Sequence, residues 1–404
     1  MQTLTPTMLI EQTVNLRILH IGKYFPPNFG GIETFMSQLM LEQQKLGLIV
    51  SGVIHCKKKQ FTKVEHVWHG CKLYCVNTYG QFAYAPIAPA FPMVLLKALK
   101  HERPDIVHIH MPNSSAYWLL VLSLFTKKNQ KWVVHWHSDV LGTIPDLKVK
   151  LLYPIYCIFE RWLLKKADAV ICTSPNYLES SKPLTSYQNK CFVIPLGISI
   201  PEGTQKPSIS KGHDDNTLRL ICIGRLTYYK GHALLFEAIK QLTLLGKNII
   251  LDVVGEGELK NQLQAMAKDK GLERCIHFHG GVSEAEKYRL LNHANMLCLP
   301  SIERTEAFGV VILEAAAMAK PALVSDVEGS GMSFVVKERE TGLVVKANSV
   351  ESLRKQLLWA QQNLDHLQLF GGAACLRFNE IFSMETASLK ISSVYIGDKI
   401  EPAV

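Results

Sequence analysis

"MLCLPSIERTEAFGVVILEAAAMAKP", residues 296–321, is the stretch that decides the fold. MLCLP has the composition of a buried strand, SIERTEAFG is typical of a polar loop, and VVILEAAAMA continues as a mostly apolar helix. A buried strand that leads through a loop into a helix is the repeating unit of a doubly wound parallel sheet. Ligands bind such sheets outside the carboxyl ends of the strands, so this loop is expected to carry functional side chains.

Glu314 stands among apolar residues in the helical part of this stretch. A charge in such surroundings is costly unless a partner binds it. Gly309 argues against one continuous helix, so we place Glu306 in the loop and Glu314 about five residues into the helix, where both can point at one ligand. The alternative is that Glu314 reaches solvent or pairs with a lysine. Because the flanking alanines and valines leave little polar face, we expect ligand hydroxyls as its partner rather than another side chain.

The same alternation of short apolar runs and longer helical patterns continues along the chain, and it predicts an α/β fold of two doubly wound, Rossmann-like domains facing across a cleft. Strands are expected at residues 16–21, 49–55, 106–110, 132–136, 169–173 and 192–195, and at 218–223, 249–254, 276–279, 296–300, 322–325 and 342–345. Residues 198–217 are rich in Pro, Gly, Ser and Asp and lack periodicity, which is typical of a linker. The expected domains are residues 1–197 and 218–375, and a helical segment, 376–404, is expected to pack back on the first domain.

Composition limits the function classes. The 404 residues are 48% apolar and 20% charged, which suits two globular domains of ordinary size. The net charge is +9, but residues 1–200 carry 21 Lys and Arg against 11 Asp and Glu, whereas residues 201–404 carry 23 against 24. The basic half suits an anionic partner, and the lack of a recognisable nucleic-acid motif argues against DNA or RNA.

Several features predict a cytoplasmic protein. The sequence has no run of the roughly 18 to 20 apolar residues that a membrane span needs and no basic region followed by an apolar core at its start. Its ten cysteines are scattered, several within strand-like runs, and are expected to be thiols in a reducing compartment. The group His66, His69, Cys71 and Cys75 matches no standard zinc spacing, so no metal site is expected there.

Three residues of the first half follow expected strands. Gly30 and Gly31 precede a helix, and this arrangement lets backbone N–H groups and the helix end approach an anion. The alternative is an ordinary strand–helix loop, and the segment is not a Walker loop. His137 stands at the carboxyl end of another strand, where ligand-binding side chains belong, although a lone histidine is usually structural.

The second half offers two cations and two glycines after strands. Arg225 and Lys230 follow its first strand, where they can neutralise a diphosphate; a solvated basic loop is the alternative. Gly255 and Gly257 follow the next strand. Lys260 occupies the place of the third glycine of a dinucleotide fingerprint, so a nicotinamide enzyme is not expected.

Six motifs in the right order resemble those of the retaining glycosyltransferases of family 4, which have the glycosyltransferase B fold. These are PPNFGGIE, HSD, GRLTYYKG, GEGELK, GGVSEAEKYRLL and EAFGVVILEAAA. The likeness extends from about residue 16 to about residue 375. YYKG, together with HWHSD and GKYFPP, is most similar to bacterial polysaccharide and lipopolysaccharide enzymes, many of which use GDP-mannose.

The resemblance implies a role for each matching residue. Glu314 would bind the donor ribose, and Glu306 would hold the donor sugar together with the backbone of Phe308, Gly309 and Val310. Arg225 and Lys230 would bind the diphosphate, and the loop at Gly30 and Gly31 would close on the phosphates. Gly255 would contact the donor, and Val282 would contact its base. His137 would lie beside the reacting sugar. The candidate catalytic residues are thus His137, Arg225, Lys230 and Glu306, and Glu303 is a further acidic residue of the same loop.

The expected reaction needs no metal and no cofactor besides the nucleotide sugar. The sequence has no Asp-x-Asp pair, so the metal–diphosphate chelate of other glycosyltransferases has no obvious ligands. Arg225, Lys230 and a helix N-terminus can stabilise the leaving diphosphate. The resemblance implies that the acceptor attacks the face from which the leaving group departs, and that a glycan or polyprenyl-diphosphate-linked acceptor binds the first domain.

Residues 148–166, KVKLLYPIYCIFERWLLKK, combine apolar and aromatic residues with lysines at both ends. This pattern suits an amphipathic helix on an anionic bilayer, which predicts peripheral attachment to the inner face of the plasma membrane. A core helix whose lysines reach solvent is the alternative, and Pro154 predicts a break or a helix start.

Two other functions stay open. One is sugar-nucleotide epimerisation, for which no acid/base arrangement is evident in the sequence. The other is a non-catalytic donor-binding subunit, against which the intact set of site residues argues.

Overall fold

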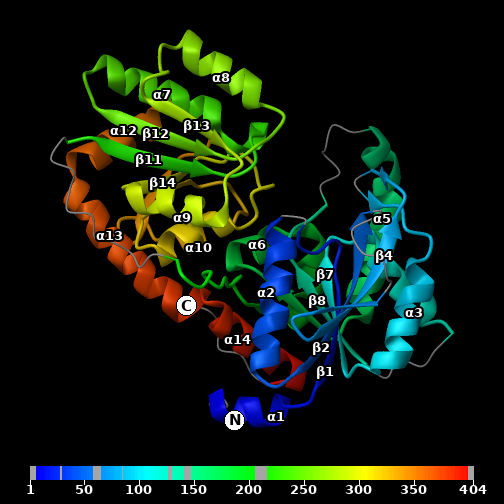
Figure 1. The fold of residues 1–404 in the computed structure, drawn as a ribbon. Coiled ribbons are helices and arrows are strands. Elements are labelled where there is room, and N and C mark those ends of the chain that lie inside the picture. The colour runs from blue at the N-terminus through cyan, green and yellow to red at the C-terminus, as the bar shows by residue number, and fades with distance from the viewer. Residues whose placement is uncertain are drawn as a thin grey trace. The chain divides into compact units, whose positions relative to one another are not determined.

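The computed structural model describes residues 6–27, 30–57, 65–83, 85–125, 130–140, 147–204 and 216–398. The chain divides into two units, the first made of Met1–Gly197 and Met384–Val404 and the second of Ile198–Ser383 (Figure 1). The chain therefore returns to the first unit at Met384 and not at residue 376. Of the expected linker, residues 205–215 lie outside the described residues.

An eight-stranded sheet in the order β10-β9-β8-β7-β1-β2-β4-β3 forms the centre of the first unit, and all neighbours are parallel except β3 and β4. Its strands are β1 (Arg17–Ile21), β2 (Ile49–Lys57), β3 (Glu65–Trp68), β4 (Cys71–Thr78), β7 (Ile106–Met111), β8 (Lys131–Trp136), β9 (Ala169–Cys172) and β10 (Cys191–Val193). β5 (Gln81–Phe82) and β6 (Ala85–Pro86) form a separate short ladder. The six strands predicted for the first half are confirmed to within two residues at each end.

The hairpin of β3 and β4 is not predicted from the sequence. A turn at His69 and Gly70 joins the two strands. His66 and His69 are exposed on this hairpin, whereas Cys71 and Cys75 are buried. The four side chains therefore do not point at one common ligand.

Helices cover the first sheet: α1 (Pro6–Thr13), α2 (Gly31–Lys45), α3 (Phe91–Glu102), α4 (Trp118–Leu122), α5 (Leu147–Lys166), α6 (Pro175–Ser180) and α14 (Met384–Ile396), with the 3₁₀ turns η1 (Ser114–Tyr117) and η2 (Lys182–Lys190). α14 packs against α1 and α2. α5 continues through Pro154, so the expected break or start at this residue is wrong. Pro154 and Lys150 are both exposed, so the proline lies on the outer side of the helix.

The second unit contains a six-stranded parallel sheet in the order β13-β12-β11-β14-β15-β16. Its strands are β11 (Leu218–Ile223), β12 (Ile249–Val254), β13 (Ile276–Gly280), β14 (Met296–Leu299), β15 (Ala322–Ser325) and β16 (Gly342–Val345). Its helices are α7 (His232–Leu244), α8 (Lys260–Asp269), α9 (Glu284–His293), α10 (Val310–Ala317), α11 (Met332–Val335), α12 (Val350–Gln362) and α13 (Leu364–Arg377), with the short turns η3 (Tyr228–Lys230) and η4 (Phe378–Phe382). The prediction of two Rossmann-like domains is confirmed.

Strand order places the ligand-binding edge of the second sheet. Counted along the chain, the order is 3-2-1-4-5-6, the order of the dinucleotide-binding fold. Its topological switch point lies between the first and fourth strands, which here are β11 and β14. Ligands bind outside the carboxyl ends of the strands at this point, so the loops after β11 and β14 are the candidates.

Gly231 allows these two loops to pack closely. It follows η3 with a φ of 72°, in the left-handed region, and a Cβ atom there would lie 2.0 Å from the Pro300 carbonyl oxygen. Gly246, after α7, has the same φ, but a Cβ atom would meet nothing within 4 Å. The two glycines share one backbone conformation and differ in the space around it.

This difference gives a stability prediction. Gly246→Ala should lower the free energy of unfolding by about 1–2 kcal/mol, the cost of a left-handed alanine. Gly231→Ala should lower it further, because its Cβ would also push apart the loops after β11 and β14. Urea denaturation of both variants measures the two changes, and equal losses would contradict the close packing of these loops.

Candidate active site

The loops after β11 and β14 meet through a buried ion pair. The Ile302 amide donates to the Tyr229 carbonyl over 2.8 Å, and the Lys230 ammonium pairs with the Glu306 carboxylate. Lys230 ends η3, whereas Glu306 lies in the loop before α10. Two of the predicted site residues thus contact each other at the switch point of the sheet.

Water has little access to the Lys230–Glu306 pair, whose side chains are 10% and 13% exposed. Burial by itself lowers the pKa of Lys230, but the Glu306 carboxylate opposes this effect, and the net shift of the pKa is upward. Lys230 is therefore a cation at neutral pH. A phosphate that binds here meets a charge that is already in place.

Gly309 separates the two glutamates of the motif. Its φ is 74°, a left-handed conformation that ends the loop, and α10 begins at the next residue, Val310. Ser330 Oγ donates to the Glu306 carbonyl over 2.6 Å and holds this part of the loop. As the sequence predicts, Glu306 lies outside the helix and Glu314 is the fifth residue within it.

Glu314 has a side-chain partner. Lys287 Nζ lies 3.0 Å from Glu314 Oε1 and 2.9 Å from Glu284 Oε2. Burial raises the pKa of Glu314, and Lys287 opposes that shift. The expectation that no side chain pairs with Glu314 is therefore wrong, because α9 brings a lysine to α10.

Lys287 was not singled out in the sequence, although it lies within the GGVSEAEKYRLL motif. Glu284 and Lys287 are three residues apart on α9, a spacing that places them on one side of the helix. That spacing predicts the pair with Glu284. The contact with Glu314, 27 residues further along the chain, depends on how α9 and α10 pack.

Gly255 and Gly257 let the loop after β12 approach the loop after β11. A Cβ atom at Gly255, whose φ is 136°, would lie 2.0 Å from the Gly224 carbonyl oxygen. A Cβ atom at Gly257 would lie 2.2 Å from the Leu226 carbonyl oxygen. Chain packing explains both glycines without a ligand.

The other predicted residues of the second unit lie near these loops in the sequence. Arg225 follows β11 and is exposed, Val282 precedes α9 and is half-buried, and Phe308 is buried. Glu303 accepts a hydrogen bond from the Tyr228 hydroxyl over 2.7 Å. The loop after β11 therefore contains an exposed cation, Arg225, a few residues before the shielded cation, Lys230.

Gly30, Gly31 and His137 belong to the first unit. Gly30 precedes α2 in an extended conformation, with a φ of −177°, and Gly31 is the first residue of the helix. Asn28 and Phe29 of the PPNFGGIE motif lie outside the described residues. His137 follows β8, is buried, and pairs through Nε2 with another histidine over 3.0 Å.

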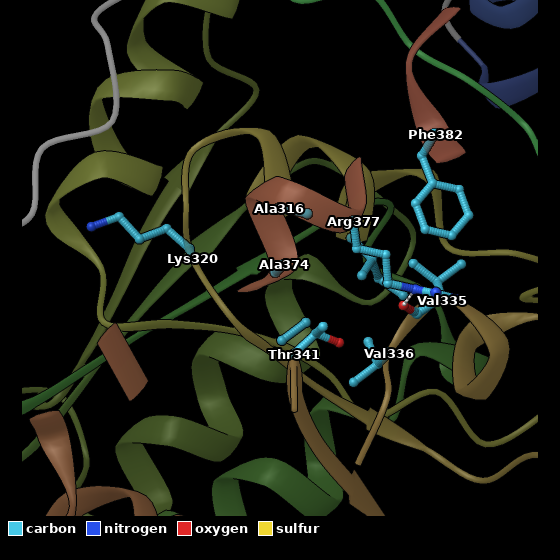
Figure 2. Close-up of a pocket in the computed structure, with 10 residues that line it drawn as sticks. Ala316, Lys320, Val335, Val336, Thr341, Ala374, Arg377 and Phe382 are labelled. Carbon is cyan, nitrogen blue, oxygen red and sulfur yellow. Dashed lines mark hydrogen bonds between the residues drawn. The ribbon is translucent and has the colours of Figure 1, made fainter. Parts of the chain in front are cut away.

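A narrow pocket elsewhere in the second unit lies between α10 and α13 (Figure 2). Arg377 lies beside Phe382 and Val335 in this pocket and donates to the Phe334 carbonyl over 3.0 Å. The lining residues are Ile312, Ala316, Lys320, Ala322, Val335, Val336, Thr341, Ala374, Arg377 and Phe382. They include none of the predicted site residues.

The ion pair can be tested by a double-mutant cycle. Lys230→Met or Glu306→Gln alone should lower the free energy of unfolding by about 3–5 kcal/mol, because each leaves a buried group without its partner. The double variant should lose clearly less than the sum of the two. In the more exposed pair of Lys270 and Glu237, Lys270→Met should cost no more than about 1 kcal/mol. Additive losses at Lys230 and Glu306 would contradict direct pairing.

Two family models match the chain. The Glycosyltransferase Family 4 model matches residues 29–201, and the model of Glycosyl transferases group 1 matches residues 205–373. O-antigen chain mannosyltransferase C of Escherichia coli is 27% identical over 92% of this chain and 95% of that protein. D-rhamnosyltransferase WbpZ of Pseudomonas aeruginosa is 28% identical over 91% of this chain and 92% of that protein.

Solved structures show the same architecture. Sucrose-phosphate synthase from Thermosynechococcus elongatus matches with a TM-score of 0.76 at 19% identity, over 95% of this chain and 98% of that chain. One family model falls mainly on the first unit and the other on the second. The chain belongs to the glycosyltransferases with the glycosyltransferase B fold, with a Family 4 first unit and a group 1 second unit.

Proposed function

We propose that this glycosyltransferase moves a hexose with retention from a nucleoside diphosphate sugar to a glycan or polyprenyl-diphosphate-linked acceptor. Mannose from GDP-mannose is our first choice of donor, and cell-surface polysaccharide or lipopolysaccharide synthesis is the expected process. The observation that carries this proposal is the shielded Lys230–Glu306 pair at the switch point. One of the two relatives is named a mannosyltransferase, which supports the choice of mannose, and the other is named a D-rhamnosyltransferase, which supports sugar transfer without favouring mannose.

The leaving diphosphate needs positive charge at this edge of the sheet. It gains negative charge as the glycosidic bond breaks. Arg225 is an exposed cation after β11, Lys230 is a cation that Glu306 keeps charged, and the N-terminus of α10 adds a partial positive charge. Because these charges are fixed before the reaction, they stabilise the leaving group without reorganisation.

The two glutamates would bind hydroxyls of the donor. An ionised carboxylate accepts hydrogen bonds on both oxygens, whereas a protonated one loses part of that capacity. Burial raises the pKa of Glu314, and Lys287 counteracts this. Lys287 would thus favour the ionised form of Glu314, which would accept bonds from the ribose, while Glu306 would accept bonds from the sugar.

Retention would follow from attack on the face that the leaving group vacates. The bond between the anomeric carbon and the phosphate oxygen breaks, and a bond from that carbon to the acceptor oxygen forms on the same side. The proton of the acceptor hydroxyl passes to the departing phosphate oxygen. This route needs no carboxylate nucleophile.

A panel of nucleotide sugars tests the proposal and separates it from its two alternatives. The protein is incubated with GDP- and UDP-linked hexoses, and the sugar and nucleotide products are analysed by mass spectrometry and NMR. Release or transfer of the sugar with its anomeric configuration kept is the expected result. A changed sugar still attached to its nucleotide would indicate an epimerase, and binding without turnover would indicate a non-catalytic subunit.

Two site variants should affect different kinetic steps. Glu314→Ala should weaken donor binding by more than about 1 kcal/mol, because it removes a charged acceptor of hydrogen bonds. Lys230→Ala should lower turnover more than donor affinity. Glu284→Gln is the matched control, since Glu284 binds the same Lys287 but is 59% exposed. Donor titrations and steady-state rates measure both effects, and unchanged kinetics would remove the altered residue from the site.

α5 of the first unit has an exposed apolar stripe that supports membrane attachment. Leu147, Leu151, Ile155 and Ile158 are 79%, 76%, 53% and 63% exposed and follow one face of the helix. Lys148, Lys150, Lys165 and Lys166 place cations near both ends. The sequence and exposure of α5 suit a helix that rests on an anionic bilayer. In the described residues no helix is long and apolar enough to span a membrane.

Liposome sedimentation tests the stripe. The protein should pellet with anionic vesicles. The double variant Leu151→Glu with Ile155→Glu should stay in the supernatant, because the two carboxylates cannot enter the apolar part of the bilayer and are repelled by the anionic lipid headgroups. Leu244→Glu is the control, as Leu244 is 77% exposed on α7 of the other unit. Wild-type protein that stays in the supernatant with every vesicle would refute membrane attachment.

A further inference from the structure

Five histidines form a buried row on one face of the first sheet. His20 lies on β1, His108 and His110 on β7, and His135 and His137 on β8 and directly after it. Residues two apart on a strand point to the same face, and the parallel register sets His20 beside His108 and His110 beside His135. Neighbouring rings stack with centroids between 4.3 and 5.7 Å apart.

All five imidazoles are uncharged at neutral pH. Burial lowers the pKa of His137 to about 3 and that of His20 to about 4. It also lowers the pKa values of His108, His110 and His135 well below the ordinary value. A neutral imidazole has one N–H group and one bare nitrogen. Each ring of the row can therefore donate at one nitrogen and accept at the other.

Gln43 of α2 sets the direction of the first branch of hydrogen bonds. Its amide nitrogen donates to the Tyr395 hydroxyl over 2.8 Å, so its Oε1 accepts from His20 Nε2, also over 2.8 Å. The bare Nδ1 of His20 then accepts from His110 Nε2 over 3.0 Å, and His110 Nδ1 accepts from His137 Nε2 over 3.0 Å. His137 keeps a bare, buried Nδ1 that has no hydrogen-bond partner among the described residues.

Tyr395 of α14 sets the direction of the second branch. Its oxygen accepts from Gln43, and its O–H donates to His108 Nδ1. His108 Nε2 donates to His135 Nδ1 over 3.2 Å, which leaves His135 with an N–H group at Nε2 that finds no partner in the described part of the chain. The two branches form one chain of uniform direction, with a bare acceptor at His137 and a free donor at His135.

We propose that Gln43 and Tyr395 are positioning residues that fix the direction of this chain, and that Gln43 thereby keeps His137 Nδ1 a bare acceptor. The inference rests on the proposed function and on the place beside the reacting sugar that the family resemblance implies for His137. With the opposite tautomer His137 would offer an N–H group. Exchanging the two amide atoms of Gln43 would reverse every bond of the chain, so the orientation of this one amide decides the tautomer.

A metal ion is the competing explanation of the row. The ligand atoms of His110, His135 and His137 lie within 4.8 Å of one another. However, only two of the six ring nitrogens of this trio lack a hydrogen-bond partner, and zinc sites use at least three protein ligands. The uniform chain of hydrogen bonds accounts for the other four nitrogens, whereas a metal would have to break it.

Nitrogen-15 NMR of the full chain tests the proposal, with histidine signals assigned by single substitutions. Long-range correlations from the ring protons should show His137 and His135 protonated at Nε2 and bare at Nδ1. Protonation of His137 at Nδ1 would overturn the assigned direction. Shifts of these rings that saturate with one equivalent of Zn²⁺ would also overturn it, in favour of a metal site.

Two variants should release different parts of the chain. Gln43→Leu should give His137 a mixture of tautomers while His135 keeps its own, because the Tyr395 hydroxyl then has only His108 left to donate to. Tyr395→Phe should give mixtures at both histidines, because the Gln43 amide loses the hydroxyl that fixes its orientation. Gln361→Leu removes a buried glutamine of the second unit and is the matched control. The same change at both histidines in both variants would mean that lost packing, not the direction of the hydrogen bonds, controls the tautomers.

Kinetics then separate this inference from the proposed function. In Gln43→Leu, turnover should fall by about twofold or more while the KM for the donor is unchanged, because only part of the molecules hold the competent tautomer. If His137 showed mixed tautomers in Gln43→Leu while turnover stayed normal, the positioning role would be contradicted. A wild-type protein that transfers no sugar would contradict the proposed function and would leave the tautomer result standing.

Discussion

The ion pair between Lys230 and Glu306 is the interaction on which the second unit's site depends. It joins the loops after β11 and β14, the two strands on either side of the topological switch point. Gly231 makes the contact possible, because any larger residue would collide with the Pro300 carbonyl. Gly309 keeps Glu306 out of α10, so that its carboxylate can reach Lys230. The site is thus a product of strand order and of two glycines with left-handed conformations.

The same site contains a second shielded pair, and the two pairs have one physical effect in common. Lys287 and Glu314 are 13% and 18% exposed, comparable to Lys230 and Glu306. Each charge would be expensive to bury alone, and the carboxylates raise the pKa values of Lys230 and Lys287 against the effect of burial. A donor that carries both phosphates and hydroxyls could use such a surface, because the two lysines are charged before it binds. The first half of the sequence carries the surplus positive charge, which would suit an anionic acceptor or an anionic membrane that binds the first unit.

Much of this could be predicted from the sequence, because local patterns determine it. Strand–loop–helix units, the loop position of Glu306 and the helical position of Glu314 follow from apolar runs and one glycine. The partner of Glu314 could not be predicted, since Lys287 reaches it only through the packing of α9 on α10. The histidines are visible in the sequence as pairs two residues apart. Their common direction depends on Gln43 and Tyr395, residues of two helices that lie 352 positions apart and meet only in the folded chain.

Hydrogen–deuterium exchange with a saturating nucleoside diphosphate tests the central claim most directly, because it locates the bound ligand without assuming a reaction. Ligand contacts and closure slow exchange in the segments that they order. The account predicts slower exchange of the amides in residues 224–231 and 301–314, the two loops joined by Lys230 and Glu306. Protection that spares both loops and lies instead around the pocket between α10 and α13 would contradict it.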